Sequence, residues 1–494
     1  MTDIVMLLPG NKLLPDAAFI KRIIKVGKAS VIAIHSLKVL ESGGLDREQF
    51  SECHMQYGID LASIDPDFRL RDIILVRTSS NTIQSNFQLF HLWNWPDSTY
   101  DIEAIRIPHK RKTDPRNNPL GKNPGNVWTF SQELDDGNIG TQMKLFEQEN
   151  IETICDGSIE TNALGRIIFC HSLKGDTIHF RCSSDDLGKI KNIITEAGRI
   201  PNQIVSGKPD AFRKIEIPLI ELPITELGER ESGGGLLARG KIDTIPYAKY
   251  YIVDCRQGLK ELPLESINDV VTSPPYNIGY DPFNVPKPST RSGEMVAPER
   301  TGYEDELAPG QYHCLIKTTM ESLNEKMDGI SSDIFLNIKN NYGGSECRPP
   351  FWILKLMPKE WILSDILIWR YDISYDPAKN KYKPYYEWIF RLTKGEVNYC
   401  NKHRYLRDFY IPILKGNSRE RKDLKHPAIF PKDIVKSCLA ESSHEGLVLD
   451  PFLGSGTTLA VAWELGRSFI GFEINATYVS DIELRLARAK RYFH

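Results

Sequence analysis

Residues 270–276 read Val270-Val271-Thr272-Ser273-Pro274-Pro275-Tyr276. The apolar run is typical of a buried strand, and the tetrapeptide that follows is expected to form a rigid loop at its end. The two prolines fix two φ angles and remove two backbone donors, so a carbonyl in this loop meets no local N–H. A hydroxyl, such a carbonyl and an aromatic ring could together receive a planar ring that carries an amino group. Taken alone, the same stretch fits a proline-rich turn with a packed tyrosine equally well.

The second informative stretch is Val448-Leu449-Asp450-Pro451-Phe452-Leu453-Gly454-Ser455-Gly456-Thr457-Thr458. It predicts a buried strand ending in an acidic residue, a Gly-x-Gly loop, and a helix that begins near Thr457. Such a junction is the usual cofactor position in a doubly wound sheet, because glycines let a ligand approach the backbone. Glu473 follows Gly456 by 17 residues, at the end of the next predicted strand, where a carboxylate can accept both hydroxyls of a ribose. The full dinucleotide pattern and the phosphate loop are both missing, so the stretch favours a nucleoside cofactor over a simple tight turn.

Strand and helix patterns alternate along the whole chain, which predicts an α/β fold. We expect an N-terminal α/β domain over 1–228, a charged and glycine-rich linker over 229–246, and a second α/β domain over 247–494. Predicted strands cover 4–8, 30–34, 73–76, 250–253, 270–272, 334–338, 366–369, 387–392, 447–449 and 468–472. Predicted helices cover 16–27, a segment ending at Leu262, 431–441, 457–465 and 478–491.

Three segments of the first half can be laid on three segments of the second in the same order, which suggests a degenerate duplication. The pairs are 3–11 with 269–277, 72–77 with 365–370, and 89–92 with 389–392. In this alignment the first half lacks the hydroxyl, one proline and the aromatic ring of the 273–276 loop. Chance similarity among apolar strands is the alternative.

Composition is that of an ordinary globular protein, with 41% hydrophobic and 26% charged residues among 494. The net charge of −3 gives no overall basic field, so any nucleic acid must be met by local patches. Nine scattered cysteines contain no Cys-x-x-Cys pair, which argues against a zinc site or a disulfide framework and fits a reducing compartment. Without a signal-like start or an 18-residue apolar run, we expect a cytoplasmic location and no membrane partner.

The order of Ser-Pro-Pro-Tyr first and Asp-Pro-Phe-x-Gly-Ser-Gly-Thr later resembles the DNA amino-methyltransferases of the β permutation group. The resemblance covers about residues 247–492. Further matching pieces are Asp254, the His-Pro-x-x-x-Pro element at 426–431, the Gly466-Arg467 pair, the strand ending at Glu473, Tyr478, and, in the first half, 118–128. The family implies a Rossmann-like, circularly permuted methyltransferase sheet with S-adenosylmethionine as methyl donor.

The family pattern implies a role for several of these residues. The methionine end of the donor would lie near Asp450, Phe452, Gly454 and Gly456, with Thr457 at the helix start. Glu473 would hold the ribose, and Asp254 would lie near the adenine. Ser273 and the Pro274 carbonyl would bind the target amine, and Tyr276 would stack on the base. Pro275 would stiffen the loop through its fixed φ angle, independently of the family pattern.

The chemistry expected from these residues is direct transfer of a methyl group to an exocyclic amine of a flipped base. The sequence has no Pro-Cys dipeptide, which argues against the covalent cytosine-C5 mechanism. Ser-Pro-Pro-Tyr resembles the cytosine-N4 enzymes, whereas Asp-Pro-Pro-Tyr marks most adenine-N6 enzymes. We therefore expect a cytosine-N4 DNA methyltransferase of a restriction-modification system, possessing a companion endonuclease, with adenine-N6 as the alternative base.

Two basic stretches, 401–426 and 106–122, are the candidate contacts to double-stranded DNA. The residues singled out in them are Arg404, Arg407, Lys415, Arg419, Arg421, Lys110, Arg111 and Arg116. A solvated charged face is the plainer interpretation of either stretch. An RNA or protein-glutamine methyltransferase and a non-catalytic DNA-binding subunit are the remaining alternatives, the latter describing 1–228 better than the second half.

Overall fold

A computed structural model provides the structure of the chain, and its description covers part of the residues in each half. In the first half these are 4–7, 30–35, 45, 47, 67–77, 87–95, 98, 127–129, 161–171, 174, 176–181 and 187–203. In the second half they are 246–264, 266–277, 290–291, 294–295, 307–327, 329, 331–343, 346–370, 382, 385–397, 407–410, 424, 426, 429, 431–442 and 446–489.

The first half builds a seven-stranded sheet with the strand order β5-β3-β4-β2-β1-β6-β7. Its strands are β1 (Ile4–Leu7), β2 (Ser30–His35), β3 (Arg69–Arg77), β4 (Phe87–Asn94), β5 (Val127–Thr129), β6 (Thr177–Arg181) and β7 (Ile200–Gln203). Two helices, α4 (Thr161–His171) and α5 (Leu187–Glu196), pack on one face of this sheet. Only β4 runs antiparallel to its two neighbours; the other pairs are parallel.

The second half builds an eight-stranded sheet with the order β17-β15-β16-β12-β9-β18-β19-β8. Its strands are β8 (Ala248–Ile252), β9 (Asp269–Thr272), β12 (Ser331–Ile338), β15 (Trp361–Arg370), β16 (Tyr386–Gly395), β17 (Arg407–Tyr410), β18 (Val448–Asp450) and β19 (Phe469–Glu473). Two short hairpins, β10 (Thr290–Arg291) with β11 (Glu294–Met295) and β13 (Asn341–Gly343) with β14 (Glu346–Arg348), lie outside this sheet. All residues of β9, β12, β18 and β19 are buried, as expected of strands covered on both faces.

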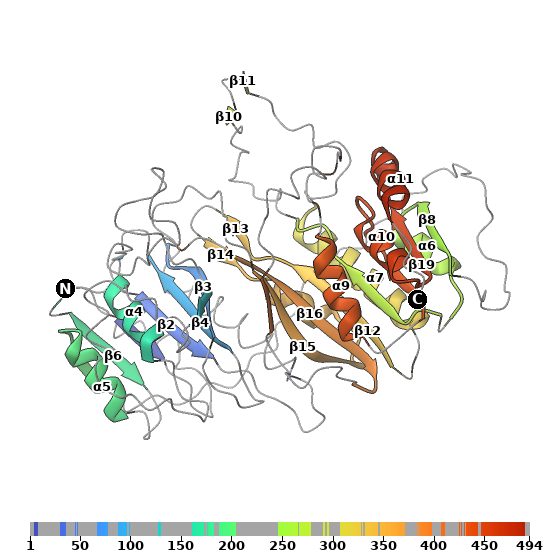
Figure 1. Ribbon diagram of the computed structural model, residues 1–494. Coiled ribbons are helices and arrows are strands. Elements are labelled where there is room, and N and C mark those ends of the chain that lie inside the picture. Colours follow the sequence, from blue (N-terminus) through green and yellow to red (C-terminus); the bar gives the residue numbers. More distant parts are fainter. Residues whose placement is uncertain are drawn as a thin grey trace.

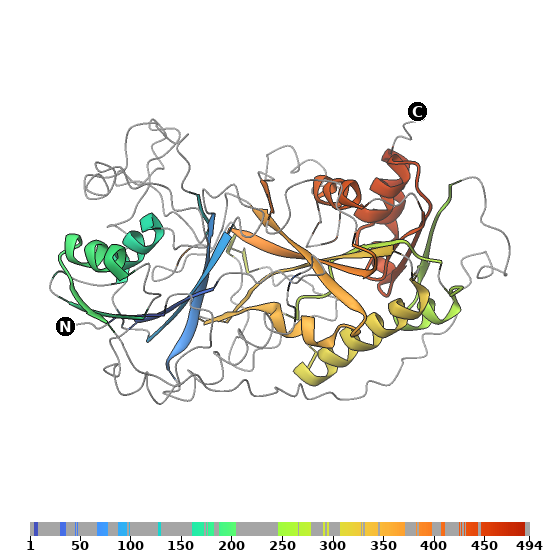
Figure 2. The same cartoon turned by 90° about the horizontal axis from the view of Figure 1, so that it is seen from below.

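Helices cover both faces of the second sheet (Figures 1 and 2). They are α6 (Cys255–Glu261), α7 (Pro309–Lys326), the 3-10 helix η2 (Pro350–Leu356), α9 (Lys432–Glu441), α10 (Thr457–Glu464), the 3-10 helix η3 (Ala476–Tyr478) and α11 (Val479–Arg488). Local sequence explains where they begin. Asp254 caps α6 by accepting the backbone N–H of Arg256 at 2.8 Å, and Pro309 occupies the first turn of α7.

Two buried ion pairs join the starting ends of the central strands. Arg391 binds Asp333 through two bonds of 3.1 and 2.6 Å, and Arg467 binds Asp269 at 2.5 Å. Asp269 and Asp333 are opposite one another in the parallel pair β9–β12. These charges therefore hold the sheet at the end away from the carboxyl ends of β9 and β18, leaving those ends for chemistry.

The strands expected from the sequence are confirmed, and so are the helices ending near Leu262 and covering 431–441, 457–465 and 478–491. The predicted helix 16–27 and the linker residues 229–245 lie outside the described residues. Within the described part of the chain, no helix is long and apolar enough to cross a bilayer.

The strand pairing also tests the alignment of the two halves. By register in the two sheets, Asp72 corresponds to Asp365 as expected. The other two segment alignments are wrong by one residue, because Ile4 rather than Asp3 takes the place of Asp269, and Leu92 rather than His91 takes that of Arg391.

Candidate functional site

The two loops singled out in the sequence lie side by side at one edge of the second sheet. They follow β9 and β18, which are adjacent and parallel, so both strands end at the same edge. The Thr272 hydroxyl donates to Asp450 Oδ1 at 2.6 Å, and the Thr458 hydroxyl donates to the Val271 carbonyl at 3.2 Å. These bonds fix the Ser273 loop against the glycine loop, although about 180 residues separate them in the chain.

The backbone conformation of the glycine loop requires glycine at positions 454 and 456. Gly454 and Gly456 have φ of 54° and 79°, in the left-handed region that disfavours a side chain. A Cβ on Gly454 would also lie 3.0 Å from His426 Nε2, and one on Gly456 would lie 3.3 Å from the Ile482 backbone. Gly456 precedes α10, which begins at the buried Thr457. The loop is therefore a close-packed junction at the end of β18, in which a side chain at either glycine would meet its neighbours.

Glu473 ties the end of β19 to this loop. Its Oε2 accepts the Gly454 N–H at 2.7 Å, and its Oε1 accepts the Asn475 N–H at 2.8 Å. Burial raises the pKa of Glu473 to about 7. Burial also raises the pKa of Asp450 to about 6, against hydrogen bonds that stabilise its ionised form. The site thus contains two carboxyl groups that titrate near neutral pH.

Asp254 lies at the end of β8, on the far side of β19 from the glycine loop. Its carboxylate forms a bidentate pair with Arg256, through bonds of 3.0 and 2.5 Å. Both side chains are nearly buried. Asp254 therefore lines the pocket as a locally neutralised carboxylate rather than as a free charge.

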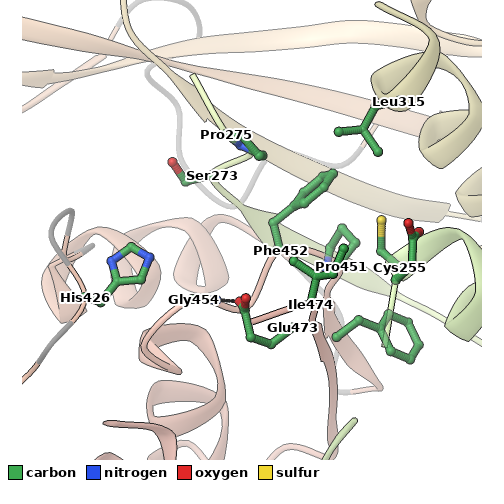
Figure 3. Close-up of a pocket in the computed structure, with 12 residues that line it drawn as sticks. Cys255, Ser273, Pro275, Leu315, His426, Pro451, Phe452, Gly454, Glu473 and Ile474 are labelled. Carbon is green, nitrogen blue, oxygen red and sulfur yellow. Dashed lines mark hydrogen bonds between the residues drawn. The ribbon is translucent and has the colours of Figure 1, made fainter. Parts of the chain in front are cut away.

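A single open pocket collects these elements, with an empty volume of about 660 Å³ that includes some open solvent. Its lining residues are Asp254, Cys255, Ser273, Pro275, Leu315, His426, Pro451, Phe452, Gly454, Phe472, Glu473 and Ile474. Figure 3 shows Ser273 and Pro275 on one side of this space and Glu473 with Gly454 on the other. The size and the mixture of apolar walls with a few polar groups are those of a site for a small organic ligand.

A hydrogen-bonded chain extends from Ser273 away from the pocket. The Ser273 hydroxyl donates to Tyr276 Oη at 2.8 Å. Tyr276 Oη in turn lies 2.8 Å from Asn337 Oδ1 and 3.0 Å from Glu387 Oε2, and can donate to either. Asn337 is the penultimate residue of β12 and Glu387 is the second residue of β16, so antiparallel pairing brings both to the edge where β9 ends.

Charged groups and an unusual backbone conformation surround the loop of Ser273 and Tyr276. Glu387 is buried, which raises its pKa, while the charge of Lys339 opposes that rise. Lys339 Nζ lies 4.9 Å from the centre of the Tyr276 ring and covers one of its faces. Asn277, directly after the loop, has a φ of 51°, which is uncommon for a residue with a side chain. Its side-chain amide donates to the Leu307 carbonyl at 2.7 Å, which holds this conformation.

The structure brings most of the sequence-derived residues together. Ser273, Pro275, Asp254, Phe452, Gly454 and Glu473 line the pocket. Pro274, Tyr276 and Gly456 belong to the same two loops, and Asp450 and Thr457 flank the glycine loop at the end of β18 and the start of α10. The DNA-binding candidates Arg404, Lys415, Arg419, Arg421, Lys110, Arg111 and Arg116 lie outside the described residues, and Arg407 is described only as part of β17.

Sequence reasoning missed Asn337 and Glu387 as members of the site. Each lies at one end of a correctly predicted strand, next in the sheet to the strand of Ser273 or one strand further. The strand order, which the sequence does not reveal, was needed to bring them beside Tyr276. His426 belonged to a recognised sequence element but had no predicted place in the pocket.

Residues 267–484 match a family model described as "DNA methylase" (N6_N4_Mtase). DNA adenine methyltransferase YhdJ of Escherichia coli K12 is 27% identical over 270 residues, covering 48% of this chain and 82% of the relative. Type II methyltransferase M.SmaI of Serratia marcescens is 27% identical over 285 residues, covering 49% of this chain and 91% of the relative. The matched region of this chain is therefore similar to DNA methylases.

Solved structures also match this chain. The PvuII DNA methyltransferase, named as cytosine-N4-specific, is 21% identical with a TM-score of 0.38, covering 49% of this chain and 87% of that one. The M1.HpyAVI–SAM complex is 16% identical with a TM-score of 0.33, covering 48% of this chain and 99% of that one.

Proposed function

We infer that the second half of this chain is a DNA methyltransferase whose reaction site lies between the Ser273 loop and the glycine loop. We propose that it transfers a methyl group from S-adenosyl-L-methionine to the N4 amine of cytosine in double-stranded DNA. The observation that carries the proposal is the Thr272–Asp450 bond, because it holds the Ser273 loop, our proposed amine acceptor, directly beside the glycine loop, our proposed nucleoside site. A permuted order of the sheet, with the acceptor loop before the glycine loop in sequence, belongs to the same proposal.

The residues of the pocket fit the methyl donor. Glu473 retains lone pairs beyond its two backbone partners, so the ionised carboxylate can still accept ribose hydroxyls. Phe472, Ile474 and Leu315 supply apolar walls for a purine, near Asp254. The donor contributes an electrophilic methyl group. Phe452, Gly454 and Gly456, with Asp450 and Thr457 behind them, form the proposed seat of its methionine end.

On the acceptor side, Ser273 Oγ and the Pro274 carbonyl would accept hydrogen bonds from the target amine. These bonds favour a pyramidal nitrogen whose lone pair points at the methyl group, which an amine conjugated to its ring otherwise lacks. Since Lys339 covers one face of the Tyr276 ring, the other face is the one offered to a base. The target base must leave the stack to arrive there.

The Ser273–Tyr276–Glu387 chain gives the proton of the amine a way out. Forming the N–C bond, while the sulfur–methyl bond breaks and its electron pair stays on the sulfur as a neutral thioether, would leave the nitrogen with one proton too many. Ser273 Oγ would accept that proton while its own passes to Tyr276 Oη, and the phenolic proton passes to Glu387 Oε2, over distances of 2.8 and 3.0 Å. The raised pKa of Glu387 suits a carboxylate that must hold a proton.

Cytosine is the proposed base because residue 273 is a serine. A neutral hydroxyl tolerates the ring acceptors of cytosine better than a carboxylate at this position would. Adenine-N6 is the second candidate, and the similarity to an adenine methyltransferase of Escherichia coli supports it. Protection of host DNA beside an endonuclease of the same target is the proposed setting, in line with the similarity to a type II methyltransferase.

The test incubates the full chain with duplex DNA and methyl-labelled S-adenosyl-L-methionine, then identifies the labelled nucleoside by mass. We expect N4-methyldeoxycytidine. N6-methyldeoxyadenosine would overturn the choice of base, and the absence of label from a broad set of duplexes would overturn the function. Ser273→Ala should lose the activity, while Ser437→Ala, at a half-buried serine on α9 that bonds the Asp433 carbonyl of its own helix, is the matched control that should retain it.

A further inference from the structure

The two halves of the chain share one sheet topology. Seven strands of the first sheet have counterparts of the same order and the same relative direction in the second, and β8 has none among the strands that the structure describes. The counterparts are β5 and β17, β3 and β15, β4 and β16, β2 and β12, β1 and β9, β6 and β18, and β7 and β19. Two helices also correspond: α4 precedes β6 as α9 precedes β18, and α5 joins β6 to β7 as α10 joins β18 to β19.

A shared irregularity fixes the register. The β3–β4 pair shifts register between Leu70 and Asp72, and the β15–β16 pair shifts between Leu363 and Asp365. In both strands the aspartate Oδ1 accepts the N–H of the next residue, at 2.9 Å from Ile73 and 2.8 Å from Ile366. A bulge with the same side-chain bond at the same place makes the equivalence of Asp72 and Asp365 specific.

The halves meet through equivalent faces. In a single continuous hydrophobic cluster lie both members of five corresponding pairs: Leu70 and Leu363, Ile73 and Ile366, Leu75 and Ile368, Leu89 and Trp388, and Trp93 and Leu392. The opposite faces form separate clusters. Ile74 and Val76 pack beneath α4 and α5, whereas Leu367 and Trp369 pack beneath α9 and α10. Figure 2 shows the two sheets side by side with the helices α4 and α5 on the outer face of the first.

Contacts across this boundary are reciprocal. Leu45, after β2, forms an antiparallel bridge to Leu363 of β15, with its N–H 2.7 Å from the Leu363 carbonyl. The register of β2 and β12 makes Arg348 the counterpart of Leu45, and β14, which contains Arg348, packs against β3. The segment after β2 thus contacts the bulged strand β15 of the second half, and the segment after β12 contacts the bulged strand β3 of the first half. Such reciprocal contacts are those of an isologous two-fold interface.

We propose that residues 4–203 stand in the place of a second methyltransferase-like subunit, so that the chain is an intramolecular pseudo-dimer and a monomer in solution. The first half covers the face of β15 and β16 through which two copies of the second half would otherwise associate. One hydrophobic core is shared by the two halves. The first half is therefore held in a fixed position against the second.

The register also shows why such a pseudo-dimer has one reaction site. At the positions of Ser273 and Tyr276, the first half has Leu8 and Asn11 in sequence. At those of Asn337 and Glu387 it has Ile34 and Gln88. On the donor side, Phe180 stands at the position of Asp450, and continuing the sequence past β7 in the same register gives Val205 for Glu473. Neither the acceptor groups nor the donor-binding carboxylates of the second half are present.

The experiment uses the full chain with a protease site inserted within Gly233–Gly235. Before cleavage, light scattering should give the mass of one chain, 56.3 kDa. After cleavage, we expect the two fragments to elute together in a 1:1 complex of that mass. Separation of the fragments, or a particle of twice the mass before or after cleavage, would overturn the proposal. None of these readouts depends on methyl transfer, so failure of the proposed function is distinguished from failure of this inference.

A disulfide checks the interface itself. The variant L45C/L363C should form a cross-link under mild oxidation, which keeps the two fragments together on a non-reducing gel after cleavage. The matched control is L45C/L264C, since Leu264 is 67% exposed and takes no part in the shared cluster. A covalent species of twice the chain mass from L45C/L363C would mean that the contact joins two chains, which contradicts the proposal.

Discussion

Glu387 is a buried carboxylate in β16, where an apolar side chain would be expected. A buried carboxylate without a full counter-charge costs free energy, and the strand would be more stable with an apolar side chain in its place. Its position 3.0 Å from Tyr276 Oη instead links it to the hydroxyl that we propose accepts the target amine.

We therefore expect Glu387→Gln to lower kcat by about 10²-fold or more, because glutamine can accept the Tyr276 hydrogen bond but cannot take the proton. The affinity for S-adenosyl-L-methionine should not change, since Glu387 lies on the acceptor side. Single-turnover methylation with a pH profile, together with titration of donor binding, measures both. Glu396→Gln, at an exposed position in the same segment, is the control. A normal rate in the Glu387 variant would remove the proposed relay.

Glu473 gives donor binding a pH dependence. Its pKa is raised to about 7 by burial, so the protonated form prevails in the free protein below that pH. The ionised form is the one that accepts ribose hydroxyls with all its lone pairs. If only that form binds, affinity should rise about tenfold between pH 6 and pH 8 and then level off. Calorimetric titration across this range should show the rise in the wild type and a flat, weaker response in Glu473→Gln. A pH-independent wild-type affinity would contradict the assignment.

Among the elements, the glycine loop depends on backbone shape. Gly454→Ala places a Cβ on a residue with φ of 54° and 3.0 Å from His426 Nε2. We expect a loss of stability of about 1–2 kcal/mol and a larger loss of donor affinity, because the loop must shift and the Gly454 N–H leaves Glu473. Denaturant unfolding and donor titration test this. Gly188→Ala is the control, since a Cβ there meets nothing within 4 Å, and it should be neutral or stabilising.

The opposite end of the sheet depends on paired charges. Arg467→Met would leave Asp269 buried among Asp333 and the strand starts without its partner, which should cost about 3–5 kcal/mol in the free energy of unfolding. The double variant D269N/R467M should recover part of this loss, because no uncompensated charge remains. Arg488→Met, at an exposed position of α11, serves as the control. If Arg467→Met were as stable as Arg488→Met in chemical denaturation, this would argue against a structural role for the Asp269–Arg467 pair.

Elements with strong local signals were predictable from the sequence. The strand before Ser273, the glycine loop and the helix after it were all recognised, because a strand, two glycines and a helix start follow one another directly. Glu387 was not recognised as part of the site, because its proximity to Tyr276 depends on strand pairing between distant segments. The one-residue error in aligning β1 with β9 has the same origin. Apolar strands tolerate a slip in sequence, whereas the bulge at Asp72 and Asp365 does not.

For the whole molecule, the equivalence of the halves relates the two basic stretches to each other. The stretch 106–122 precedes β5, and the stretch 401–426 surrounds β17. These two strands are counterparts and lie at the same edge of their respective sheets. A pseudo-dimer with a basic segment attached at the corresponding place in each half would grip DNA from both halves while methylating from one.

The two triple variants K110A/R111A/R116A and R404A/R419A/R421A test this arrangement. Each should weaken DNA binding, and each should lower the slope of log affinity against log salt by roughly 2 to 3, because three phosphate contacts are lost from one half. K174A/K189A/K191A removes the same charge from exposed positions, one between α4 and β6 and two in α5, and it should leave the slope unchanged. Fluorescence anisotropy with one duplex over a range of salt concentrations gives the three slopes. If only the triple variant in the 401–426 stretch changed the slope, the first half would be a structural partner that does not contact DNA through 106–122. Equal changes from both stretches would mean that the lost chemistry of the first half was replaced by a share in holding the substrate.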